Sequence, residues 1–207
     1  MPDAAALIAI LVIGLGALAV GLVAAPYKSF DLDRFFVPKE LALHLAALCL
    51  GPLALWRRRR LGYSGVDLLL ALFLALSAVS AVFTTNHWLA ERSLAVTWSS
   101  LVVFWSATAI AAGQPARERA VVGALVLTVL MVAATSLLQA YGVDSTFFSA
   151  NRAPGGTLGN RNFVAHLAAI AAPLLVVAAV GARRRFSSVM ATLALALVSG
   201  VLVLSRT

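Results

Sequence analysis

The sequence is poor in charge. Only 12% of its 207 residues are charged, and the 16 Lys and Arg residues outnumber the 8 Asp and Glu residues. A soluble domain carries about 25% charged residues, so the composition excludes an ordinary soluble enzyme. Hydrophobic residues make up 62% of the chain and occur in runs of about twenty, the length that a helix needs to cross the hydrocarbon core of a bilayer. The deficit of charge therefore indicates a membrane protein.

Other absences narrow the class further. Apolar and polar residues do not alternate, as the strands of a transmembrane barrel require. The single cysteine, Cys49, excludes an intrachain disulfide. There is no HxxxH spacing, cysteine cluster or pair of carboxylates, so neither a metal nor another cofactor is expected. The net charge of +8 comes from short clusters between apolar runs, which indicates membrane topology rather than binding of nucleic acid.

The apolar runs predict an all-α, polytopic transmembrane helix bundle that forms a single domain over residues 1–207. The first run lacks the positively charged segment of a signal peptide, so it is interpreted as a retained span. Pro38 is expected at the first helical position of the second span, where its missing N–H costs nothing. The seven predicted spans lie at about 4–25, 39–56, 66–85, 94–113, 120–142, 163–182 and 189–205.

Basic residues predict the orientation of the spans. The loops after spans two, four and six carry nine Arg residues, including the runs 57–60 and 183–185, whereas the opposite side carries seven Lys and Arg residues. Basic residues favour the cytoplasmic side, so the N-terminus is expected in the cytoplasm. The seven basic residues of the outer side either pair with local acids and lipid headgroups or hold an anion.

A polar stretch, PGGTLGNRN at 154–162, stands at the outer start of the sixth span. The first turn of a helix leaves backbone N–H groups without partners and carries partial positive charge. Asn160 or Asn162 is suited to cap that turn. The glycines of the stretch, Gly159 among them, allow the backbone to adopt positive φ and to approach a ligand closely.

Two arginines, Arg152 and Arg161, add full charges beside this helix start. Guanidinium groups together with free backbone N–H groups suit a phosphate or a diphosphate at the membrane surface. The alternative interpretation is a capped helix start after an ordinary turn, because helix caps are commoner than anion sites. The spacing of the residues leaves both interpretations open.

Other ionisable groups in the spans have less specific roles. His166 lies about one turn into the sixth span and is either a polar packing contact or a proton-handling group. His44, inside the second span, and His87, in an outer loop, have no partner that the sequence identifies. Lys39 is expected to anchor the second span at the interface, with its charge neutralised by Glu40.

Three short motifs occur in an order typical of one family. The first is FDLDRFFVPK at 30–39, and the second is GNRN at 159–162, which opens a span containing Pro173. The third is the Ser-Arg pair that closes the seventh span. In these motifs the chain resembles the O-antigen ligase and polymerase superfamily of bacterial inner-membrane proteins. Arg161 departs from the proline that the family commonly has between the two asparagines.

The resemblance implies an enzyme that transfers a glycan from undecaprenyl diphosphate to the lipid A core, or to a similar acceptor, at the periplasmic face of the bacterial inner membrane. Its implied partners are membrane lipid, the lipid-linked glycan and the glycan acceptor. Arginines would hold the diphosphate, whereas the candidate base is a histidine of a later periplasmic loop, so no catalytic residue is expected in this chain. The expected diphosphate-binding residues are Arg206, Asn160, Arg161, Asn162, Gly159 and Arg152.

Family members have further spans, so the chain is expected to be the N-terminal part of a longer protein and inactive by itself. Three other interpretations stay open: an O-antigen polymerase, a bicarbonate-type transporter of the same superfamily, and a nonfunctional fragment or subunit. A transporter would carry polar groups near the middle of the bilayer, whereas polar residues here concentrate at the outer ends of spans. The main interior polar residues, which are expected to pack helices together, are Ser77, Ser80, Thr128, Thr135 and Ser136.

Overall fold

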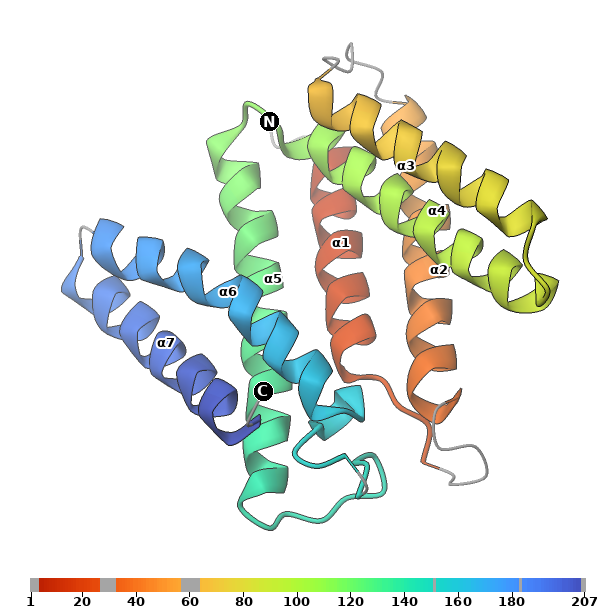
Figure 1. Cartoon of the computed structure of the whole chain (residues 1–207). Coiled ribbons are helices and arrows are strands. Elements are labelled where there is room, and N and C mark those ends of the chain that lie inside the picture. The colour runs from red at the N-terminus through yellow and green to blue at the C-terminus, as the bar shows by residue number, and fades with distance from the viewer. Residues whose placement is uncertain (1–3, 27–32, 57–63, 151, 183, 206–207) are drawn as a thin grey trace. The chain divides into compact units, whose positions relative to one another are not determined.

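Seven long α-helices and one short 3-10 turn make up the regular structure of the described residues (Figure 1). The computed structural model describes residues 4–26, 33–56, 64–150, 152–182 and 184–205. Each of the seven helices is long and apolar enough to cross a bilayer, which confirms the predicted all-α, multi-pass membrane fold. The helices are α1 (Ala4–Leu22), α2 (Asp33–Trp56), α3 (Gly65–Val82), α4 (His87–Ala111), α5 (Pro115–Ala140), α6 (Arg161–Gly181) and α7 (Arg185–Ser205), and the 3-10 turn η1 (Gly156–Leu158) precedes α6.

Helix α2 begins at Asp33, before the predicted start of the second span near residue 39. The expectation that Pro38 occupies the first helical position is therefore wrong, because Pro38 lies in the second turn. A proline inside a helix has no N–H to offer to the carbonyl four residues earlier, which here belongs to Arg34. That carbonyl instead accepts a hydrogen bond from the N–H of Ala25 at 2.8 Å. The bond ties the segment after α1 to the first turn of α2.

Helix α4 also begins before its predicted start near residue 94. Its N-cap is Asn86, whose side chain accepts a hydrogen bond from the N–H of Leu89 at 3.2 Å. The prediction that His87 lies in a loop is wrong, because His87 is the first residue of the helix. The polar segment 87–93 lowers the local hydropathy and so falls outside the predicted span, but its cap lets it continue the helix.

The chain divides into two compact units. Unit 1 comprises Met1–Gly16 and Glu40–Val122, and unit 2 comprises Ala17–Lys39 and Gly123–Thr207. Helices α3 and α4 belong wholly to unit 1, and α6 and α7 belong wholly to unit 2. The core of unit 1 consists of Ala6, Ala9 and Ile13 from α1, Leu50 from α2 and Ile110 from α4.

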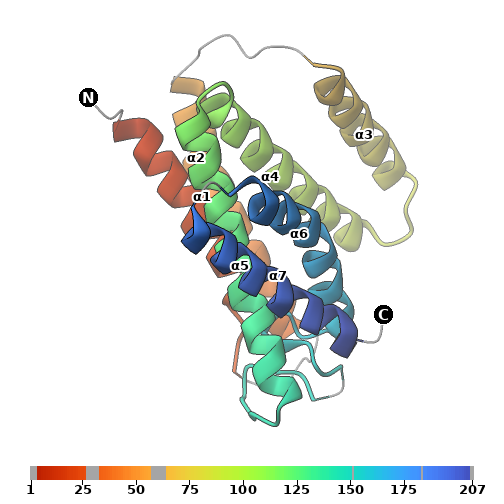
Figure 2. The same cartoon turned by 90° about the vertical axis from the view of Figure 1, so that its left-hand side faces the viewer.

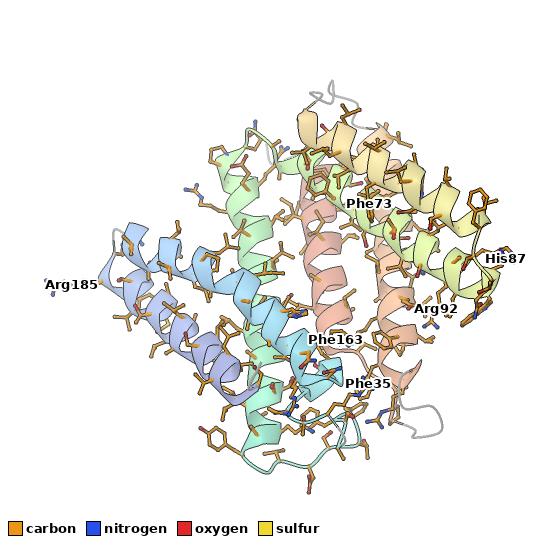
Figure 3. The ribbon with its side chains drawn as sticks, in the orientation of Figure 1. Phe35, Phe73, His87, Arg92, Phe163 and Arg185 are labelled. Carbon is orange, nitrogen blue, oxygen red and sulfur yellow. The ribbon has the colours of Figure 1, made fainter. Side chains whose placement is uncertain are left out.

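Two polar contacts join α2 to α4 in unit 1. The Nε of Arg92 donates to a carboxylate oxygen of Glu40 at 2.7 Å (Arg92 is labelled in Figure 3). About one turn further along α2, the Nδ1 of His44 and the hydroxyl oxygen of Ser99 lie 2.7 Å apart. Glu40 thus neutralises Arg92 rather than Lys39, which corrects the expected pairing. His44 has a packing partner on another helix, which favours a structural role.

Unit 2 packs α6 and α7 side by side as an antiparallel hairpin (Figures 1 and 2). Because the two helices are antiparallel, α7 ends on the side where α6 begins. The end of α1 lies close to α5, since a Cβ at Gly21 would come within 2.9 Å of Val132. The buried core of unit 2 includes Val129 and Val132 from α5, Val164, Ala168 and Leu175 from α6, and Val198 and Val201 from α7.

The outer surface of the helices suits a bilayer. Large apolar side chains such as Leu69, Val177 and Val180 are exposed, as expected where lipid replaces water. Aromatic residues typically mark the two membrane–water interfaces. Exposed aromatic side chains lie at the ends of several helices, at Trp56, Phe83, Trp88 and Tyr141.

Candidate anion site at the start of helix α6

The segment between α5 and α6 folds back against the end of α5. The hydroxyl of Ser136 donates to the carbonyl of Pro154 at 2.6 Å, and the side-chain amide of Gln139 donates to the carbonyl of Ser149 at 2.8 Å. The side-chain oxygen of Gln139 also accepts a hydrogen bond from the N–H of Gly156 at 2.9 Å. Ser136, expected to pack one helix against another, instead fixes this loop.

Thr157, in turn η1, is buried and bonds to two helices. Its hydroxyl donates to the carbonyl of Gly21, at the end of α1, at 2.9 Å. Its N–H donates to the hydroxyl of Thr135, in α5, at 3.3 Å. Buried polar groups need such partners. The turn that leads into α6 is therefore held by both α1 and α5.

The glycines of the turn are required by packing. Gly159 has a φ of +73°, and a Cβ at this position would come within 2.5 Å of the Phe35 ring. Gly156 has a φ of +50°, and a Cβ there would collide with the hydroxyl of Thr135. Residues with a side chain rarely adopt such positive φ values. The close approach that these glycines permit is to α2 and α5, and Figure 3 shows Phe35 and Phe163 beside the start of α6.

The first turn of α6 is capped and accessible. Asn160 is the N-cap, and its side-chain oxygen accepts a hydrogen bond from the N–H of Asn162 at 3.0 Å, which confirms the predicted cap. The N–H of Arg161 donates to the carbonyl of Arg152 at 3.1 Å, so the backbones of the two arginines are neighbours. The side chains of Asn162, Arg161 and Arg152 are exposed. Two guanidinium groups can therefore reach an anion at this turn.

Arg34 is a buried cation whose role the sequence did not reveal. Its side chain is only 3% exposed. One terminal nitrogen donates to the carbonyl of Thr146 at 3.1 Å, and the other donates to the carbonyl of Phe148 at 2.7 Å. The guanidinium carbon lies 4.5 Å from the centroid of the Phe35 ring. Its Nε has no hydrogen-bond partner among the described residues.

Lys39 is held by backbone oxygens at the end of α1. Its ammonium group donates to the carbonyl of Val23 at 2.6 Å and lies 3.5 Å from the carbonyl oxygen of Gly21. The last carbonyls of a helix carry partial negative charge, so a cation is stabilised there. Lys39 and Arg34 both lie in the 30–39 motif, which was the one sequence signal that set them apart.

Among the described side chains at this end of unit 2, positive charges outnumber negative ones. None of its four cations forms an ion pair with a carboxylate of the described residues. Asp144, in the segment between α5 and α6, is exposed. A concentration of unpaired positive charge raises the local concentration of anions. The four cations are Arg34, Lys39, Arg152 and Arg161.

The structure bears differently on two further residues singled out from the sequence, Arg206 and His166. Arg206, expected to contribute most to diphosphate binding, lies outside the described residues. Helix α7 ends at Ser205, which is buried and donates to the carbonyl of Leu202 at 2.8 Å. His166 is exposed on α6 and is not a contact in the core of unit 2. Across the described parts of the chain, no group of three or more His, Cys, Asp or Glu residues is placed to hold a metal ion.

The arrangement can bind an anion through charge, whereas the backbone N–H groups of residues 161–164 are already bonded to the carbonyls of Arg152 and Asn160 and to the Asn160 side chain. Arg152 and Arg161 are accessible for direct contact, whereas Arg34 and Lys39 hold the surrounding backbone and add to the positive potential. A phosphate or diphosphate combines the charge and the acceptor oxygens that such a site prefers. No protein-family model, curated protein or solved structure matches this chain.

Proposed function

We propose that the positive end of unit 2 binds the diphosphate of a polyprenyl-linked glycan. The protein then takes part in transferring that glycan to the lipid A core or a similar acceptor, as an O-antigen ligase does, at the periplasmic face of a bacterial inner membrane. The observation that carries the proposal is the set of four cations around the start of α6, none of them paired with a described carboxylate. The resemblance of the motifs at 30–39 and 159–162 supports the same chemistry.

The chemistry explains why fixed positive charge is needed. Glycosyl transfer breaks the bond between the anomeric carbon and a diphosphate oxygen. It forms a bond from that carbon to an acceptor hydroxyl oxygen, whose proton passes to a base. Negative charge grows on the departing diphosphate, and fixed guanidinium groups lower the barrier by stabilising it. Arg152 and Arg161 are suited to this role, and the base is assigned to no residue of this chain.

Binding of a prenyl diphosphate tests the proposal. The full chain is placed in nanodiscs of zwitterionic lipid, and the Kd of farnesyl diphosphate is measured beside those of farnesyl monophosphate and farnesol. The double variant Arg152→Gln/Arg161→Gln is expected to bind the diphosphate about tenfold more weakly or worse, because a hydrogen bond to a charged group contributes about 1.5–3 kcal/mol. Farnesol should bind equally to both proteins.

The matched control removes the same charge from the other end of the α6–α7 hairpin. Arg184 and Arg185 are exposed there, so Arg184→Gln/Arg185→Gln should leave the Kd of the diphosphate unchanged. Equal weakening by the two double variants would show a general effect of charge and refute the site. Equal affinity for diphosphate and farnesol in the unaltered protein would refute it as well.

The orientation of the chain is tested with single cysteines. Cys49 is replaced by alanine, and a cysteine is introduced either at Ala150, in the loop before α6, or at Gln114, in the turn before α5; both positions are exposed. A membrane-impermeant thiol reagent should label Ala150→Cys in intact spheroplasts, but Gln114→Cys only after permeabilisation. The reverse pattern would move the cations to the cytoplasmic face and remove the proposed activity.

A further inference from the structure

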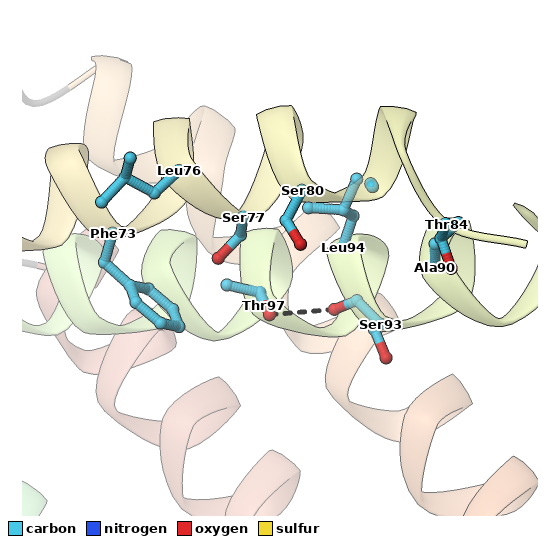
Figure 4. A pocket seen from close by; sticks show the side chains of 10 residues that line it. Phe73, Leu76, Ser77, Ser80, Thr84, Ala90, Ser93, Leu94 and Thr97 are labelled. Atoms are coloured by element: carbon cyan, nitrogen blue, oxygen red, sulfur yellow. Dashed lines mark hydrogen bonds between the residues drawn. The ribbon is translucent and has the colours of Figure 1, made fainter.

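A groove whose apolar lining carries several hydroxyl groups lies between α3 and α4 of unit 1, and the proposed function does not use it. Its volume is about 410 Å³, within the range of about 300–1,000 Å³ typical of small-molecule sites. Figure 4 shows the groove from close by, and none of its ten lining residues is charged. Five of those residues carry hydroxyl groups: Ser77, Ser80, Thr84, Ser93 and Thr97.

Four of these five hydroxyls differ from that of Thr97. Hydroxyl groups in membrane helices commonly donate to the carbonyl four residues earlier, as Thr97 does to Ser93 at 2.9 Å and Ser100 does to Val96 at 2.8 Å. By contrast, the hydroxyls of the other four, Ser77, Ser80, Thr84 and Ser93, have no hydrogen-bond partner among the described residues. Figure 4 shows the oxygens of Ser77 and Ser80 directed toward α4. The groove therefore offers unused hydrogen-bonding groups.

The hydroxyls of Ser77 and Ser80 lie at the depth of the membrane just inside the membrane–water interface. Helix α3 has 18 residues and is about 27 Å long, so it just covers a hydrocarbon core of about 30 Å. Ser77 and Ser80 lie about 8 and 3 Å from its C-terminal end. The exposed aromatic rings of Phe83 and Trp88, beside the α3–α4 turn, mark the interface. The deeper end of the groove is apolar, with Phe73 in its lining.

We propose that this groove binds one glycerolipid through its ester-linked glycerol. Serine hydroxyls are suited to donate to ester carbonyls, which lie just inside the interface, where Ser77 and Ser80 are placed. An acyl chain would then extend along the apolar end toward Phe73. The absence of charge from the lining fits an uncharged glycerol ester, whose charged headgroup, if it has one, stays in the aqueous layer. Phospholipid and diacylglycerol share this chemistry, and the retained mass distinguishes them.

Native mass spectrometry of the full chain, released from nanodiscs, tests this site. In diester phosphatidylcholine containing a small fraction of diacylglycerol, we expect one lipid to remain on each chain. Retention should fall about fivefold or more in Ser77→Ala/Ser80→Ala/Ser93→Ala, the change expected when a neutral hydrogen bond is lost. The unaltered protein should show the same loss in diether phosphatidylcholine, which lacks the ester carbonyls.

The control variant is Ser100→Ala, because Ser100 is exposed on α4 and donates within its own helix. Its retention should equal that of the unaltered chain. Ser80→Ala alone, at an exposed position, provides a second test should the triple variant lose helical content by circular dichroism. Equal retention of diester lipid by all variants would overturn the proposal. Serine-dependent dimers without bound lipid would also overturn it, because the groove would then be a helix interface.

Discussion

Replacement of Gly159 by alanine is expected to lower the free energy of unfolding by about 3 kcal/mol. Two costs add. A residue with a side chain costs about 1–2 kcal/mol in the left-handed region, where Gly159 lies with a φ of +73°. Overpacking of a buried site costs about 1–3 kcal/mol, and the new Cβ would lie within 2.5 Å of the Phe35 ring. Unfolding by sodium dodecyl sulfate in mixed micelles measures the loss.

The control for this substitution is Gly200→Ala, inside α7. A Cβ at Gly200 meets nothing within 4 Å, so the variant should be as stable as the parent or up to about 1 kcal/mol more stable. In the double variant Phe35→Leu/Gly159→Ala, the free energy of unfolding should rise above that of Gly159→Ala by the overpacking cost alone. The cost of the strained φ remains in both variants. If the free energy of unfolding of Gly159→Ala lies within about 0.5 kcal/mol of that of the parent, neither the positive φ nor the contact with Phe35 requires the glycine.

Replacement of Arg34 by methionine is expected to release the loop between α5 and α6. The variant removes two hydrogen bonds to the carbonyls of Thr146 and Phe148. Hydrogen bonds to charged groups contribute about 1.5–3 kcal/mol each, so the expected loss of stability is about 3 kcal/mol. A cysteine at Ala150, in a protein without Cys49, should react with a thiol reagent several times faster in the variant.

Arg34→Lys separates charge from geometry. Lysine keeps the positive charge, but its single ammonium group cannot reproduce the fork that reaches two carbonyls, so its effect should be intermediate. The matched control is Arg185→Met at an exposed position, which should change neither the stability nor the rate of thiol labelling. If Arg34→Met behaves like Arg185→Met, the loop is held by its other contacts and Arg34 is dispensable to the fold.

The number and type of the spans could be predicted because hydropathy is a property of consecutive residues. The starts of α2 and α4 could not, because both begin in polar segments whose charges are satisfied or capped in ways that hydropathy does not record. The first turns of α2 are stabilised by a bond from Ala25, and Glu40 is neutralised by Arg92, which lies 52 positions away. Charged residues near a span reduce its hydropathy whether or not they find such partners.

The candidate site was also only partly predictable. The cap at Asn160 follows a local rule, and the structure confirms it. The reason for the glycine at 159 depends on Phe35, which is distant in sequence. Arg34 and Lys39 bond to backbone carbonyls, and the pattern of side chains in the sequence does not predict such bonds. A residue whose side chain bonds to the backbone of a distant segment cannot be recognised from a single sequence.

The loop before α6 is held largely through its main chain, with the buried hydroxyl of Thr157 as its own side-chain contact. Side chains of Arg34, Ser136 and Gln139 bond to its carbonyl groups, so the identity of the loop's own exposed side chains contributes little to its shape. The exposed side chains of the loop other than Arg152 are consequently free to diversify. The exposed surface of this segment can thus change by substitution in one short stretch, without any redesign of the helices that support it.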